Sequence, residues 1–205
     1  MGIRDDIASE RRELAALLGT LTDTQWDTPS LCAGWRVREV AAHMTMAMRH
    51  SVPRIAAELV RSRGSLDRMA DRLARHDTAG LTAEELAASL RDNADHPWKP
   101  PVGGHAMALA HDVIHGLDIT VALGLERRVP EGRLRTVLAR VTPRGARFFG
   151  ADLGGIALRA DDLDWSFGSG APVTGNAQDL LLLAFGRRPP GGRLRGAGAE
   201  RFVSA

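Results

Sequence analysis

Apolar residues recur at helical spacings through the first 125 residues of the chain. Ile3, Ile7, Leu14 and Leu18 share one face with charged residues between them, which is typical of an amphipathic helix over residues 3–21. A short helical turn is expected at residues 22–26. The same periodicity, with Ser65 and Thr82 as helix-capping residues, predicts further helices at residues 36–49, 55–60, 65–76, from 82 onward, and 105–123. The proline at position 53 either kinks the second long helix or ends it near residue 51.

The pattern changes after Gly124, a residue suited to the end of the preceding helix. Residues 130–149 contain another helix, which Pro143 breaks or restarts. Residues 156–159 and 163–167 alternate between apolar and polar positions, as half-buried strands do. Asn176 is expected to cap a last helix over residues 177–185. We therefore predict an α+β protein with a helical bundle at residues 1–125 and a small α/β domain at residues 126–205.

The helix predicted at residues 105–123 carries an unusual stripe of small and polar residues. Spacings of three and four bring Ala108, His111, His115, Asp118 and Ala122 onto one face, where a core helix would carry leucine and isoleucine. Two imidazoles one helical turn apart can bind a single divalent metal ion. The alternative is that both histidines face solvent or form hydrogen bonds in a core.

His43 strengthens the metal interpretation because it also lies on an apolar helix. A lone histidine there would most often be a hydrogen-bonded core residue. Three histidines on two helices are harder to explain in this way, since each neutral imidazole must find a partner. A site made of His43, His111 and His115 would leave a fourth coordination position open, as catalytic zinc sites do.

Other polar residues are assigned smaller roles. Asp118 either orients a ligand imidazole or pairs with an arginine, and Asp112, off the stripe, is expected to face solvent. His50 is a rival ligand, although its position near Pro53 favours a role at the helix end. Cys32 is either a nucleophile or, as we favour, a small apolar loop residue, because no base adjoins it in the sequence. His105 is expected near the mouth of the site, and His76 and His96 at the surface.

Composition limits the classes of function. The chain has 27 basic and 25 acidic residues, and the basic residues are dispersed, which argues against nucleic-acid binding. No apolar run in it is long enough to cross a membrane, and it has a single cysteine. A cytoplasmic protein is therefore expected. All basic residues except Lys99 are arginine, a bias that fits a GC-rich, actinobacterial source.

Three segments together resemble the mycothiol-dependent maleylpyruvate isomerase family, a branch of the DinB-like metalloenzymes. These segments are residues 21–44, which include CAGWRVREVAAHM, residues 111–124, HDVIHGLDITVALG, and residues 175–187, GNAQDLLLLAFGR. The resemblance implies a DinB-like four-helix bundle that binds a divalent metal, with a smaller α/β domain after it. It implies zinc foremost, with nickel as the alternative, and mycothiol or a similar low-molecular-weight thiol as cosubstrate.

The resemblance also assigns roles to individual residues. His43 matches the family's first metal ligand and His115 its last, whereas His111 stands where the isomerase has a glutamate. Arg187 matches a functional arginine of the C-terminal domain, which could bind an anionic group of the substrate. We therefore expect a thiol transferase or isomerase that acts on a small electrophile, as a monomer or homodimer. The alternative is a non-catalytic metal-binding protein of stress response or metal handling.

Overall fold

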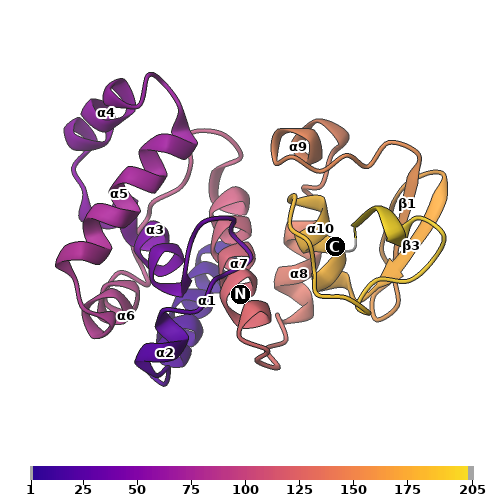
Figure 1. Cartoon of the computed structure of the whole chain (residues 1–205), viewed down its shortest axis with the longest axis horizontal. Coiled ribbons are helices and arrows are strands. Elements are labelled where there is room, and N and C mark those ends of the chain that lie inside the picture. The colour runs from indigo at the N-terminus through magenta and orange to yellow at the C-terminus, as the bar shows by residue number, and fades with distance from the viewer. Residues whose placement is uncertain (1, 203–205) are drawn as a thin grey trace. The chain divides into compact units, whose positions relative to one another are not determined.

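The computed structural model describes residues 2–202, and the chain forms two compact units that divide between Leu123 and Gly124. We call them the helical unit and the C-terminal unit (Figure 1). Helices make up the first, and a small sheet with helices makes up the second. The α+β fold class predicted from the sequence is confirmed.

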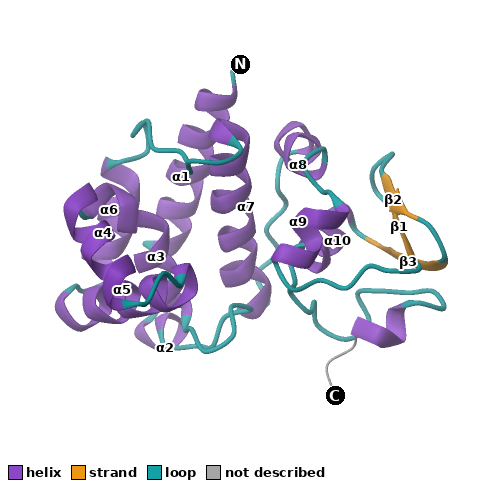
Figure 2. Ribbon diagram, turned by 90° about the horizontal axis from the view of Figure 1, so that it is seen from above, coloured by secondary structure: helices purple, strands orange, loops and turns teal. Residues whose placement is uncertain are grey.

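The helical unit is built from seven helices within the described residues. α3 packs against α5, α6 and α7, while α1 packs against α6 and α7, which gives the expected bundle (Figures 1 and 2). Its core is formed by apolar side chains such as Leu14, Val40, Leu86 and Ile119. The helices are α1 (Ile3–Leu18), α2 (Asp23–Trp26), α3 (Val37–Arg49), α4 (Val52–Arg61), α5 (Leu66–Gly80), α6 (Ala83–Asp92) and α7 (Gly104–Ala122).

Local capping explains where several of these helices begin. The hydroxyls of Ser65 and Thr82 accept hydrogen bonds from backbone N–H groups in the first turns of α5 and α6, as predicted. Pro53 lies in the first turn of α4, where a missing N–H costs no helical hydrogen bond. The chain therefore leaves α3 at His50 and starts a new helix, so the alternative of a kinked single helix is wrong.

The C-terminal unit contains a three-stranded sheet in the order β2-β1-β3. β1 runs antiparallel to β2 and parallel to β3, so that Leu158 pairs with both Phe167 and Val173. α10 packs against this sheet, and Leu180 and Leu183 complete its core. The elements are α8 (Glu131–Leu138), α9 (Pro143–Phe148), β1 (Ile156–Ala160), β2 (Ser166–Gly168), β3 (Ala171–Gly175), α10 (Ala177–Ala184) and a 3₁₀ turn, Ala199–Phe202.

Two details of this unit differ from expectation. Residues 171–175, expected only to lead into the last helix, form the edge strand β3, where Pro172 can be accommodated because an edge needs fewer N–H donors. Asn176 is the N-cap residue of α10, but its side chain makes no capping bond. The Ala177 N–H instead donates to Asp162 Oδ1 at 2.8 Å, a long-range contact that the local sequence does not reveal.

Gly186 ends α10 for a steric reason. Its φ of 77° lies in the left-handed region, and a Cβ built there would sit 1.9 Å from the Phe149 carbonyl oxygen. A side chain at this position would force the segment after α9 away from the end of α10. The sharp turn before Arg187 thus depends on glycine.

Candidate metal centre

The candidate metal centre lies where α7 packs against α3 in the helical unit. α7 is buried along almost its whole length, so the polar groups it carries must find partners inside the protein. Small residues, among them Ala42 on α3 and Ala108 on α7, are fully buried and let the two helices approach closely. His43 from α3 and His111 and His115 from α7 converge in this region.

The three imidazoles are close enough to share one ion. Candidate ligand atoms of His43, His111 and His115 lie within 4.8 Å of one another, and His43 Nε2 is 3.2 Å from His111 Nε2. The ring centroids are separated by 4.7–5.1 Å. Two nitrogens bound tetrahedrally to zinc at about 2.0–2.1 Å stand roughly 3.3 Å apart, so this spacing fits such a centre.

Two buried carboxylates orient the α7 histidines. His111 Nδ1 lies 2.9 Å from Asp112 Oδ1, and His115 Nδ1 lies 3.0 Å from Asp118 Oδ2. An imidazole that donates its Nδ1–H to a carboxylate presents the Nε2 lone pair on its other side, as metal-binding histidines do. The orienting role considered for Asp118 thus agrees with the geometry.

The expectation for Asp112 was wrong. Its side chain is 0% exposed instead of facing solvent, and it bonds to Arg11 as well as to His111. Asp112 was expected to face solvent because only the histidine stripe was taken as the packed face of the helix. In the structure both α1 and α3 pack against α7. A residue off the histidine stripe can therefore be as buried as the stripe itself.

The donor set fits a divalent metal of borderline character. Three imidazoles are ligands that zinc and nickel both accept, and two of them have the supporting carboxylate that such ligands usually have. A three-histidine set also leaves a coordination position for a further ligand. The residues present would therefore support a metal centre.

Two tryptophan rings adjoin the histidine cluster. The Trp35 ring is 5.1 Å from the His43 ring, and the Trp98 ring is 5.3 Å from the His111 ring. Trp35 is held in place because its Nε1–H donates to Asp71 Oδ1 at 2.9 Å. The two indoles form apolar walls next to the candidate centre and would report on metal binding by fluorescence.

Cys32 lies in the loop before α3, where it packs against the core of the helical unit as Trp35 does, and it also lies beside the histidine cluster. Its Sγ is 3.1 Å from Asp118 Oδ2 and 3.8 Å from His115 Nδ1. The loop that carries Cys32 is fixed to α7 by a bond from the Leu31 N–H to the Asp118 carbonyl oxygen. No base adjoins the cysteine in the sequence, but the tertiary fold supplies two polar neighbours.

The remaining histidines lie elsewhere in the helical unit. His50 is at the C-terminal end of α3, where Nε2 is 2.9 Å from Asp77 Oδ2, so the predicted helix-end role is confirmed. His76 is exposed on α5, as expected. His96 and His105 are half-buried and line a small cavity near the start of α1, together with Trp98.

Arg187 is half-buried at the end of α10. Its Nη1–H donates to the Phe185 carbonyl oxygen at 2.8 Å, which agrees with the simpler role of neutralising the end of the helix dipole. Arg193 and Arg201 pair with Asp179 and Asp152. The role of Arg187 in substrate binding stays a prediction.

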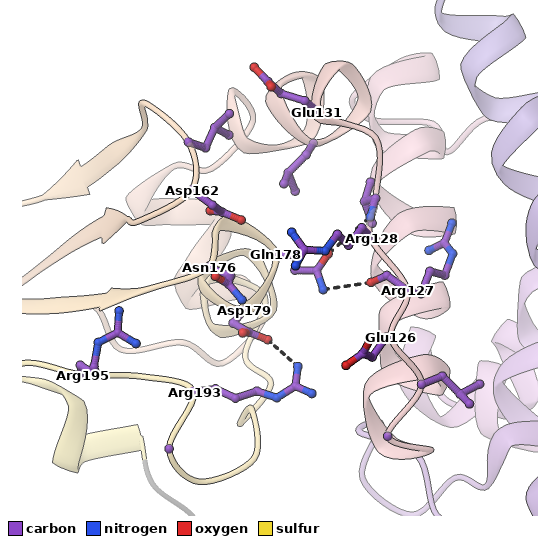
Figure 3. A pocket seen from close by; sticks show the side chains of 16 residues that line it. Glu126, Arg127, Arg128, Glu131, Asp162, Asn176, Gln178, Asp179, Arg193 and Arg195 are labelled. Atoms are coloured by element: carbon purple, nitrogen blue, oxygen red, sulfur yellow. Dashed lines mark hydrogen bonds and ion pairs between the residues drawn. The ribbon is translucent and has the colours of Figure 1, made fainter.

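The C-terminal unit has a cavity of about 540 Å³ with a mainly polar lining (Figure 3). Asp179 is nearly fully buried there and accepts a bond from Arg193 Nη1 at 3.1 Å. Burial raises the pKa of Asp179 and the nearby Asp162 adds to this, although the Arg193 guanidinium opposes them. Gln178 donates to the Arg127 carbonyl oxygen and thereby ties the segment after Gly124 to α10.

One family model matches more than half of this chain. Residues 7–120 match the family described as "Mycothiol maleylpyruvate isomerase N-terminal domain". Two similar solved structures are the crystal structure of the mycothiol-dependent maleylpyruvate isomerase and that of a histidine-to-alanine mutant. Each is 17% identical with a TM-score of 0.48, over 97% of this chain and 96% of the other. No curated protein matches the sequence.

Within residues 2–202, every helix is too short or too polar to cross a membrane.

Proposed function

This chain belongs to the mycothiol maleylpyruvate isomerase N-terminal domain family, and on that premise we propose that it is a metal-dependent thiol transferase or isomerase. It would use mycothiol or a similar low-molecular-weight thiol and act on a small electrophilic substrate. The metal, zinc foremost or nickel, would be held by His43, His111 and His115. One observation carries the proposal: three imidazoles from two helices converge, and carboxylates orient two of them.

The chain's own residues would prepare the site for this chemistry. When bound, a divalent ion favours the thiolate form of a thiol and so supplies a nucleophile at neutral pH. Asp112 and Asp118 accept the Nδ1–H of their histidines and hold both rings in one orientation. Trp35 and Trp98 would restrict the access of water to the open side, and Arg187 would bind an anionic group of the substrate.

His111 bears on which reaction is performed. A neutral imidazole replaces the negative glutamate that the isomerase resemblance implies at this position, so the ligand set has one negative charge fewer. The ion would then be a stronger electron-pair acceptor. This favours stabilisation of a thiolate for addition to an electrophile, and maleylpyruvate isomerisation itself is one candidate reaction among several of that class.

The test starts from protein purified without chelator. We expect elemental analysis to find about one divalent metal per chain in the wild type and little in the His43→Ala and His115→Ala variants. The matched control is His76→Ala, because His76 is exposed on α5, and this variant should keep its metal. Full metal content in both ligand variants would refute the assignment.

The second step separates an enzyme from a metal-binding protein. The metal-loaded protein is incubated with mycothiol and a panel of electrophiles, and both the loss of thiol and the conversion of each electrophile are followed over time. A transferase consumes the thiol, whereas an isomerase returns it and converts the electrophile alone, so either activity that disappears in His115→Ala supports the proposal. Full metal content with neither thiol loss nor electrophile conversion would favour the non-catalytic alternative of metal handling or stress response.

A further inference from the structure

Arg11 on α1 is a fully buried arginine. Its Nε–H donates to Asp112 Oδ2 at 2.7 Å, and the side chains of both residues are 0% exposed. Taking two charges out of water is costly, so such a pair requires well-formed hydrogen bonds. Arg11 and Asp112 are 101 positions apart in the sequence, and the α1–α7 packing brings them together.

Asp112 divides its two oxygens between two partners. Oδ2 accepts from Arg11, while Oδ1 lies 2.9 Å from His111 Nδ1. The carboxylate is therefore fixed from one side by the guanidinium, and it fixes the imidazole on the other. A rotation of the Asp112 side chain would break the bond to His111, and Arg11 opposes that rotation.

The same guanidinium also holds the loop between α6 and α7. Arg11 Nη1 lies within hydrogen-bonding distance of three carbonyl oxygens of this loop, at 3.4, 3.3 and 3.0 Å, which belong to Asn93, Ala94 and His96. Two residues later, the Trp98 ring lies 5.3 Å from the His111 ring. One side chain thus contacts both the support of a candidate ligand and the loop that brings an aromatic wall against it.

We propose that Arg11 is a positioning residue of the metal centre, which fixes the orientation of His111 through Asp112 and the position of Trp98 through the loop. This inference rests on the proposed metal site. The simpler explanation is an ion pair that only stabilises the bundle. However, buried ion pairs often add little net stability, and Arg11 Nη2 has no hydrogen-bond partner within residues 2–202. The arrangement is better suited to orientation than to maximal stability.

Two variants separate these explanations. Arg11→Lys keeps the charge but loses the planar fork that contacts Asp112 and the loop together. Asp112→Asn removes the carboxylate that joins Arg11 to His111, so it shows how much metal affinity is lost when the support of His111 is weakened directly. Arg12→Gln is the matched control, because Arg12 adjoins Arg11 and pairs with Asp95 of the same loop in an exposed ion pair.

The first measurement is the affinity of each metal-free protein for Zn²⁺, determined by competition with a chromogenic chelator. We expect Arg11→Lys and Asp112→Asn to weaken binding by about 10- to 100-fold and Arg12→Gln by less than about twofold. Melting temperature is recorded in parallel. Variants that melt earlier but bind Zn²⁺ with wild-type affinity would overturn the proposal in favour of a purely structural ion pair.

The second measurement needs no metal. Acrylamide quenching of Trp98, obtained as the difference between each protein and its Trp98→Phe version, should be stronger in Arg11→Lys than in the wild type. Unchanged quenching in a folded Arg11→Lys variant would contradict the link to the loop. A wild type that binds no Zn²⁺ would instead refute the proposed metal site, which distinguishes that failure from the failure of the positioning role.

Discussion

Helix α7 in the helical unit and helix α10 in the C-terminal unit are both apolar and buried on several sides, yet of the two only α7 carries candidate metal ligands. In α7 the buried carboxylates of Asp112 and Asp118 contact imidazoles. In α10 the buried carboxylate of Asp179 contacts the guanidinium of Arg193. The comparison shows that a buried acidic residue on an apolar helix does not itself mark a site.

The chemical partner decides what a buried carboxylate can do. A guanidinium stays protonated and has donors only, so in the Asp179–Arg193 pair the two charges neutralise each other and no lone pair is presented to another group. An imidazole held at Nδ1 keeps a second nitrogen available on the opposite side of its ring, so a carboxylate–imidazole pair passes orientation onward to a ligand. The imidazoles of the two α7 pairs therefore keep a nitrogen for a further ligand, whereas the Asp179–Arg193 pair of α10 offers none.

The sharpest test of the α7 arrangement changes one of its ligands. His111→Ala should lower metal affinity by about 100-fold or more, because it removes a ligand outright. His111→Glu should keep substantially more metal, since glutamate is the residue that the family resemblance implies at this position. Elemental analysis and Zn²⁺ titration measure both. A His111→Glu variant as metal-free as His111→Ala would contradict the correspondence between the two positions.

Removing the same charge from each helix tests the comparison directly. Asp118→Asn should weaken metal binding by about 10- to 100-fold, because the amide is a poorer acceptor for the His115 Nδ1–H. Asp179→Asn should leave metal binding within about twofold. Both are compared by Zn²⁺ titration against the wild type. Equal losses in the two variants would show that the effect is one of general stability.

A substitution just after α10 tests whether that helix contributes to function at all. If Arg187 binds an anionic group of the substrate, Arg187→Lys should lower kcat/KM by about tenfold, with metal content and melting temperature little changed. If it only caps the α10 helix, as its bond to the Phe185 carbonyl allows, activity should be retained. Steady-state kinetics on the metal-loaded enzyme decide between these outcomes.

The smallest expected effects concern pH, and they have opposite signs in the two units. Burial acts to raise the pKa of Glu39, but the hydrogen bonds and charge of Arg36 outweigh it and leave this pKa lowered. Its contribution to stability is therefore present above about pH 4.3, the unfolded value, and is lost as the pH falls through the lower folded pKa. Glu39→Gln should thus be less stable than the wild type near neutrality, with the difference shrinking in acid.

For Asp179 the folded pKa is raised by burial despite Arg193. The stability that this group contributes is fully present below about pH 3.9, which is the pKa of an aspartate in the unfolded chain. It declines as the pH rises through the higher folded pKa. Asp179→Asn should therefore gain relative to the wild type as the pH rises. Urea unfolding between pH 3 and 7 measures both variants, and trends of the same sign would contradict the assigned environments.

Much of the fold follows from local sequence. The hydroxyls of Ser65 and Thr82 and the ring of Pro53 each act within one helical turn. The sequence therefore predicts where α5 and α6 begin, and it leaves two alternatives at Pro53, a kinked helix or a new helix α4. β3 was missed because its pairing with β1 spans a sequence separation of about fifteen residues. Pro172 also weakened the local strand pattern.

The sequence by itself determined the helical periodicity, the one-turn spacing of His111 and His115, and the place of His43 on an apolar helix, because each depends on residues close together in the chain. Only the tertiary structure decided the surroundings of these histidines. Arg11 reaches His111 through Asp112, and Cys32 lies beside His115, although both residues are far from α7 in the sequence. α7 packs against two neighbouring helices at once, so its partners come from several directions, and a single helical stripe records only one of them.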